Sequence, residues 1–119
     1  MTLAEQAAAA RDRAIAPYSN FCVGAALECA DGRVFTGANI ENASYGLTMC
    51  AERVALYRAL HEGVREFRAI AVAAPGKVTP CGACRQLLWE FCGDIEVQLP
   101  TGTVRLGDLL PHAFDRRNL

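Results

Sequence analysis

The chain has 119 residues, of which 52% are hydrophobic, and its 12 basic and 13 acidic residues leave a formal net charge of −1. This length suits one domain, so we expect residues 1–119 to form a single domain with its own apolar core. Lys77 is the only lysine and no basic run occurs, which argues against a surface that tracks nucleic-acid phosphates. No apolar run reaches the roughly 20 residues that span a bilayer, and no signal-peptide pattern opens the chain. We therefore expect a soluble, cytoplasmic protein whose ligand is small and uncharged.

Hydrophobic periodicity and turn residues divide the chain into helices and strands. Thr2 and Glu5 form a capping box at the start of the first helix, and Pro17 follows its end. A turn over 30–33 joins the first two strands into a hairpin. In chain order we expect a helix over 2–15, strands over 21–29 and 34–39, a helix over 49–61, a strand over 67–74, a helix over 80–93, strands over 95–99 and 103–106, and a helical turn over 107–111. A hairpin followed by strand–helix alternation predicts a three-layer α/β/α fold with a mixed five-stranded sheet.

Three cysteines in two short motifs predict a metal site. Cys50 begins one predicted helix, and the segment from Pro80 to Cys84 begins another. Cys81 and Cys84 are three residues apart in a first helical turn, so their side chains can share one ion. Two helix N-termini directed at one point would favour three thiolates. Three protein ligands leave the fourth tetrahedral position of Zn²⁺ to water, which is the pattern of catalytic zinc sites.

Two charged residues follow Cys50. Glu52 can reach the same ion only if Cys50 is terminal in its helix, because two residues in mid-helix point about 200° apart. Arg53 is adjacent and could donate hydrogen bonds to the cysteine sulfurs. Three thiolates give the zinc site a net negative charge, which should make a bound water less acidic. We hypothesise that Arg53, with the two helix ends, restores that acidity, although an ordinary solvent-facing arginine explains the sequence equally well.

Other interpretations of the cysteines are weaker. A redox pair could account for Cys81 and Cys84, but it would make no use of the first motif. A closed structural zinc site needs a fourth ligand, for which Cys92 is the only nearby candidate. Cys92 lies among apolar residues, as do Cys22 and Cys29, and all three are more simply explained as small buried hydrophobic residues.

Together these motifs resemble the cytidine deaminase family, the small homotetrameric zinc enzymes of pyrimidine salvage. Three thiols with one glutamate are shared with other zinc deaminases. The resemblance to this particular family covers nearly the whole chain. It rests on the segments 17–21 (PYSNF), 23–27 (VGAAL), 39–45 (NIENASY), 50–53 (CAER), 80–86 (PCGACRQ) and 109–111 (LLP), with Phe114.

The resemblance implies a cytidine deaminase-like fold and hydrolytic deamination of cytidine and 2'-deoxycytidine to uridine and 2'-deoxyuridine, with release of ammonia. It implies one Zn²⁺ per subunit, bound by Cys50, Cys81 and Cys84. Such an ion lowers the pKa of its water. Glu52 would carry that water's proton to N3 of the base and then assist the departure of the amino group.

The resemblance also implies a set of substrate contacts. Asn39 and Glu41 would hold the ribose hydroxyls, which fits two residues that point the same way from an extended segment. Without the resemblance, turn chemistry would explain this pair better. Within the subunit, the resemblance further implies contacts from the ring of Phe21 and the backbone of Ala51 to the base. In a homotetramer it implies that a neighbouring subunit's site is completed by Ala43, Tyr45 and Phe114.

Three other functions stay open from the sequence. A deaminase of another aminopyrimidine nucleoside, such as blasticidin S, would share the zinc motif, but the segment 39–45 favours cytidine. A polynucleotide editor would need a basic groove. A zinc-binding module without activity is the rival of a different class, and it predicts a filled fourth ligand position.

Overall fold

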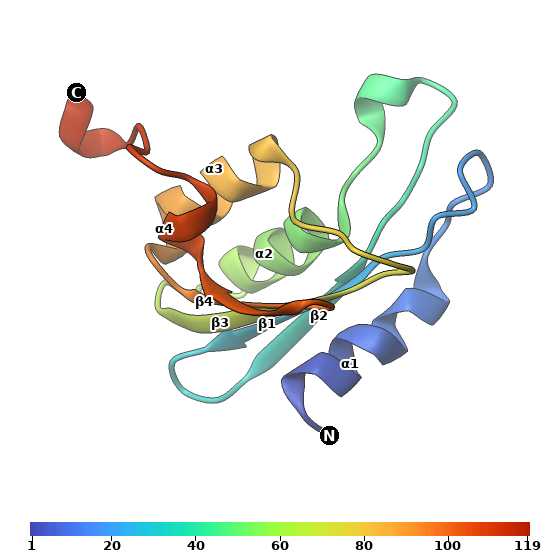
Figure 1. The fold of residues 1–119 in the computed structure, drawn as a ribbon, viewed down its shortest axis with the longest axis horizontal. Helices are drawn as coiled ribbons and strands as arrows, with labels where there is room; N and C mark the ends of the chain where they lie inside the picture. The colour runs from blue at the N-terminus through green and yellow to red at the C-terminus, as the bar shows by residue number, and fades with distance from the viewer.

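A mixed five-stranded sheet separates two layers of helices in the computed structural model, which describes residues 1–119 (Figure 1). The strands lie in the order β2-β1-β3-β4-β5, and only β3 and β4 run parallel. They are β1 (Gly24–Cys29), β2 (Val34–Ala38), β3 (Phe67–Ala73), β4 (Glu96–Leu99) and β5 (Gly102–Arg105). The predicted three-layer arrangement and mixed sheet are confirmed.

The helices divide between the two faces of the sheet. α1 (Leu3–Ala10) covers one face, and α2 (Ala51–His61), α3 (Gly82–Cys92) and the short α4 (Leu106–Leu109) lie on the other (Figure 1). Three further 3₁₀ turns span Arg11–Arg13, Tyr45–Leu47 and Arg116–Asn118. None of the helices combines the length and the hydropathy that crossing a membrane requires.

Alternation along β1 explains the two layers. Ala25 and Leu27 point toward α2 and α3 and belong to the larger apolar cluster, whereas Ala26 points the other way. Ala26 packs with Ala7 of α1 and Ala71 of β3, so the α1 face is built from small side chains. This difference lets α1 lie close to the sheet while the bulkier core forms beneath α2 and α3.

Two element boundaries lie three or more residues from their predicted positions. The first helix ends at Ala10 and continues only as a 3₁₀ turn, because the backbone N–H of Ile15 donates to the carbonyl of Asn39 at 2.9 Å. The first strand begins at Gly24 and not at Phe21, because the Asn39 side chain bonds the backbone of the preceding segment. Both predictions were wrong for the same reason: the backbone of these residues pairs with a residue far along the chain.

Candidate functional site

Two helix N-termini bring three cysteine sulfurs together. Cys50 is the N-cap of α2 and Cys81 the N-cap of α3, both with extended backbone, and Cys84 lies in the first turn of α3. The Sγ atoms are 3.8 Å apart between Cys50 and Cys81 and 3.5 Å apart between Cys81 and Cys84, and all three lie within 4.8 Å of one another. Sulfurs bound at about 2.3 Å to a tetrahedral Zn²⁺ would be about 3.8 Å apart. Cys92 is not part of this group, so the closed four-cysteine site is not formed.

The chemistry of the three thiols also fits a divalent cation. The hydrogen bond from Cys84, followed by the contact with Arg53, lowers the pKa of the Cys50 thiol to about 5. The same thiol–thiol hydrogen bond and burial raise the pKa of Cys84, which therefore keeps its proton in the absence of an ion. A bound cation would displace that proton, because only thiolates serve as ligands. Zn²⁺ is the borderline-soft ion for which a three-sulfur donor set is suited.

Arg53 lies against this cluster. Its Nη2 donates to the Sγ of Cys50 at 3.1 Å, and this contact raises the pKa of the guanidinium. The Nε of Arg53 is buried and has no acceptor. The side chain is thus half-buried at the metal cluster, and the interpretation as a solvent-facing arginine is wrong.

Glu52 lies in the first turn of α2, two residues after Cys50. Its side chain is only 5% exposed, yet it lines the same cavity as Cys50 and Cys81. Burial, and then the negative charge of Cys50, raise the pKa of its carboxyl group. Cys50 is terminal in its helix, so the condition for Glu52 to reach the metal cluster is met. A buried carboxyl group with a raised pKa is suited to taking up and releasing a proton.

The cavity beside the cluster has a volume of about 190 Å³ and a mostly apolar wall. Its lining residues are Phe21, Val23, Asn39, Thr48, Met49, Cys50, Ala51, Glu52, Val72, Val78, Thr79 and Cys81. Small-molecule sites commonly combine such an apolar wall with a few polar groups. Of the polar lining residues, Thr48 and Thr79 were not predicted, although each stands two positions before a cysteine of the cluster.

A second, wider cavity of about 600 Å³ adjoins the first and shares with it Phe21, Asn39 and Thr48. Its wall also includes Glu41, and Ala43 and Tyr45 line it from the loop after β2. The predicted ribose and base contacts therefore line two adjoining hollows.

Asn39 holds the segment that carries Phe21. Its Oδ1 accepts from the N–H of Val23 at 2.9 Å, and its Nδ2 donates to the carbonyl of Phe21 at 2.8 Å. The amide retains one further N–H for a ligand. Asn39 therefore positions Phe21 in the wall of the cavity. This structural role is compatible with its predicted ribose contact.

Glu41 holds the preceding turn. Its Oε1 accepts from the backbone N–H of Tyr18 at 3.0 Å and of Ser19 at 3.1 Å, and its Oε2 accepts from the Ser19 hydroxyl. These bonds, with the hydroxyl contact the largest, lower the pKa of the Glu41 carboxyl group. A carboxylate offers about four lone pairs, so one is left for a ligand hydroxyl.

Phe114 is not brought to either cavity within one chain. The residue is 59% exposed, on the segment that follows α4. Tyr45 is 88% exposed at the edge of the wider cavity. Both aromatic rings are thus available to another molecule, and neither is packed in a core.

Arg85 was not predicted to have a role at the site. Its guanidinium donates to the Pro80 carbonyl at 2.7 Å, the Thr79 hydroxyl at 2.8 Å and the Leu109 carbonyl at 2.8 Å. It thereby fixes the approach of the chain to Cys81. The one available signal was that no acidic residue stands three or four positions from Arg85 in its helix, which leaves the guanidinium without an ion-pair partner there.

Comparisons with known proteins point to one family. The family model for the cytidine and deoxycytidylate deaminase zinc-binding region matches residues 1–98. The cytidine deaminase of Halalkalibacterium halodurans is 50% identical, with 98% of this chain and 95% of the relative covered, and that of Mycobacterium tuberculosis H37Rv is 51% identical, with 93% and 84% covered. The crystal structure of cytidine deaminase from Burkholderia pseudomallei superposes with a TM-score of 0.88 at 54% identity, covering 96% of this chain and 100% of that one.

Proposed function

Since the chain belongs to the cytidine and deoxycytidylate deaminase family, we propose that it catalyses the zinc-dependent hydrolytic deamination of cytidine and 2'-deoxycytidine. The products are uridine or 2'-deoxyuridine and ammonia. The observation that carries the proposal is the placement of a buried carboxyl group, Glu52, in the same cavity as the sulfurs of Cys50 and Cys81. A metal cluster alone would fit many roles, whereas a proton carrier beside it fits hydrolysis.

We propose Cys50, Cys81 and Cys84 as the zinc ligands. Zn²⁺ held there would lower the pKa of a water in its fourth position. No fourth cysteine, histidine or carboxylate joins the group, which supports an open position and disfavours a zinc-binding module without activity.

Glu52 serves as the proton carrier. It accepts a proton from the attacking water and delivers it to N3 of the cytosine ring. A bond forms between C4 and the water oxygen, and the bond from C4 to the amino nitrogen breaks. Glu52 takes the second proton from the new hydroxyl group at C4, which becomes the carbonyl of the product, and passes it to that nitrogen, which leaves as ammonia. The almost complete burial of Glu52 limits competing exchange with solvent.

The adjoining cavities divide the substrate between them. Phe21 packs on the pyrimidine and the backbone of Ala51 contacts it, near the metal cluster. Asn39 and Glu41 use their remaining amide hydrogen and lone pair for the ribose hydroxyls. The fixed segment 18–23 supports this assignment, because it keeps Phe21 in place before the substrate arrives.

The chain acts as one domain within a homotetramer, in which Ala43, Tyr45 and Phe114 complete the site of a neighbouring subunit. The exposed rings of Tyr45 and Phe114 support this assembly. A cytoplasmic role in pyrimidine salvage is consistent with six cysteines that are all free, since reducing compartments keep thiols unpaired.

The test is cytidine turnover by the purified, zinc-loaded protein, followed by the change in ultraviolet absorbance as cytidine becomes uridine. We expect turnover that a chelator abolishes and added zinc restores. Turnover of another aminopyrimidine nucleoside such as blasticidin S, with none of cytidine, would contradict the proposed substrate. A zinc-loaded protein without any such turnover would support the binding module instead.

A further inference from the structure

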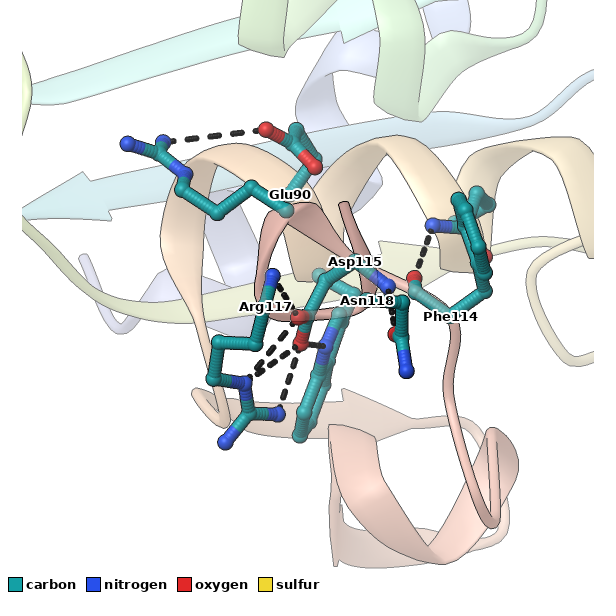
Figure 2. A network of polar contacts seen from close by, with 8 residues as sticks. Glu90, Phe114, Asp115, Arg117 and Asn118 are labelled. Carbon is teal, nitrogen blue, oxygen red and sulfur yellow. Dashed lines mark hydrogen bonds and ion pairs between the residues drawn. The ribbon is translucent and has the colours of Figure 1, made fainter.

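The segment after α4 is held on the surface of α3 by two side chains of that helix (Figure 2). The Nε2 of Gln86 donates to the carbonyl of Phe114 at 2.7 Å, and the indole Nε1 of Trp89 donates to Oδ2 of Asp115 at 2.9 Å. Gln86 and Trp89 are three positions apart, so they are neighbours on one face of the helix. They therefore bind two consecutive residues of the C-terminal segment, Phe114 and Asp115.

Asp115 connects this grip to the end of the chain. Its Oδ1 accepts from the N–H of Arg117 at 2.9 Å, and the Arg117 guanidinium contacts both of its carboxylate oxygens, the shortest at 2.6 Å (Figure 2). The Asp115 backbone N–H donates to the side chain of Asn118 at 2.8 Å. Only 11% of the Asp115 side chain is exposed, against 76% for Arg117. Arg117 and then Trp89 hold the pKa of this carboxyl group well below its usual range, so it accepts these bonds as a carboxylate.

The result is a fixed backbone beneath an exposed ring. Chain ends are ordinarily poorly ordered unless they are tied down. Here hydrogen bonds hold Asp115 and the carbonyl of Phe114 on α3, while Phe114 as a whole remains 59% exposed. A ring that is already ordered loses less conformational entropy on docking than a ring on a loose tail.

A second copy of this chain is the occupant that the structure favours for this ring. The same chain carries a hollow of about 600 Å³ with exposed aromatic side chains, Tyr18 and Tyr45, in its wall. Phe114 does not line that hollow within one chain. The Phe114 ring can therefore reach such a cavity only in a second copy of the chain.

We propose that Gln86, Trp89 and Asp115 are positioning residues that hold the C-terminal segment on α3, so that Phe114 enters a neighbouring copy's substrate site in a preformed orientation. This inference rests on the proposed function, which places Phe114 at that site. It adds the residues that put the ring there. It also makes α3 the common support of the zinc cluster and of the segment that reaches the neighbour, because Cys84 and Trp89 stand on the same helix.

The test compares Asp115→Ala with Glu90→Gln in the full-length, zinc-loaded protein. Glu90 lies on the same helix and forms an exposed ion pair with Arg116 at 3.6 Å. Such surface pairs contribute little, and Glu90 has no hydrogen bond to Phe114 or Asp115, so its variant is the control for a weak contact with the same segment. Trp89 is the only tryptophan, and its emission reports the loss of the Asp115 contact without reference to activity. Hydrogen exchange of the amides over 114–119 reports whether the segment is held.

We expect Asp115→Ala to speed that exchange about tenfold and to shift the Trp89 emission to longer wavelength. Its KM for cytidine should rise about fivefold, with kcat within about twofold of wild type, because positioning is lost and the proton carrier is untouched. Glu90→Gln should match wild type in all of these. Phe114→Ala should raise KM at least as much, with Trp89 emission unchanged.

Three results would overturn the inference. Wild-type exchange and emission in Asp115→Ala would show that the segment is not held by this contact. Faster exchange with a wild-type KM would show that holding it has no bearing on substrate. A wild-type KM in Phe114→Ala would show that Phe114 does not contact the substrate. Zinc-dependent turnover of cytidine in that variant would show that the proposed reaction holds even so.

Discussion

Arg53 is the side chain best placed to offset the negative charge of three thiolates, since its Nη2 lies 3.1 Å from the Cys50 sulfur. Groups that contact metal ligands typically change affinity or activity by about 10- to 100-fold when removed. We expect Arg53→Ala to lower zinc affinity and kcat within that range. The pH at which kcat rises should also move to a higher value. Competition with a chromophoric chelator and a pH profile measure the two effects.

Arg53→Gln separates the charge from the hydrogen bond, because the amide still donates but carries no charge. If charge is what matters, the glutamine variant should behave like alanine in the pH profile. A wild-type profile and wild-type zinc affinity in Arg53→Ala would show that the contact has no part in tuning the site.

Glu41 makes the stability of the turn over 18–20 depend on pH. Hydrogen bonds, that of Ser19 foremost, hold its pKa below the ordinary value of 4.5. A carboxylate with a lowered pKa stabilises the folded state fully above pH 4.5, and this contribution is lost as the pH falls through the folded-state value. The melting temperature of Glu41→Gln should therefore lie below that of wild type at pH 7, and the difference should shrink as the pH falls below 4.5.

Ser19→Ala is the control for this pH dependence, because it removes the contact that lowers the Glu41 pKa most. The acid-side change in stability should be smaller in this variant than in wild type. A difference between wild type and Glu41→Gln that is constant from pH 7 to pH 3 would mean that the ionised carboxylate contributes nothing.

At the scale of elements, two glycines set how closely the helices approach the sheet. A Cβ on Gly37 of β2 would lie 2.6 Å from the backbone N of Ala55 in α2, and a Cβ on Gly24 of β1 would lie 2.7 Å from the backbone N of Arg11, just after α1. Backbone atoms cannot move aside as side chains do, so each alanine substitution should displace its neighbour and lower the stability by about 1–3 kcal/mol.

Only one of the two displacements should reach the metal cluster. Gly37→Ala moves the start of α2, and with it Cys50, so zinc affinity should fall by about tenfold or more. Gly24→Ala acts on the opposite face of the sheet and should leave zinc affinity within about twofold of wild type. Urea unfolding and chelator competition measure the pair. Equal zinc affinity in the two variants would contradict the role assigned to the start of α2.

The elements also show where sequence patterns suffice. Capping by Thr2 and Glu5 and the turn over 30–33 are local signals, and both were predicted correctly. The C-terminal end of α1 and the start of β1 were not, because the backbone groups beside them pair with Asn39, which no local pattern reveals.

The candidate site follows the same division. The cysteines and Glu52 could be predicted because their residue types and spacing in two short motifs indicate a metal site. The role of Arg85 could not, since the carbonyl of Leu109 reaches it only through the fold. The grip of Trp89 on Asp115 was missed for the same reason.

For the whole molecule, the exposed rings of Tyr45 and Phe114 predict an assembly that a single chain does not complete. Light scattering on the purified protein should give a mass close to four chains of 12.8 kDa each. Turnover per chain should fall if dilution dissociates the assembly, because each site then loses its neighbour's residues. A particle of one chain with full activity would contradict the shared site.

Glu52→Gln removes the one buried carboxyl group to which we assign the proton transfer of a zinc-dependent deamination. Glutamine keeps the size of the side chain but cannot carry a proton. We expect kcat for cytidine to fall by about 10²- to 10⁴-fold or more, while metal analysis still finds one zinc per chain. A variant with near wild-type kcat, or one that loses zinc in proportion to activity, would show that Glu52 is not the proton carrier.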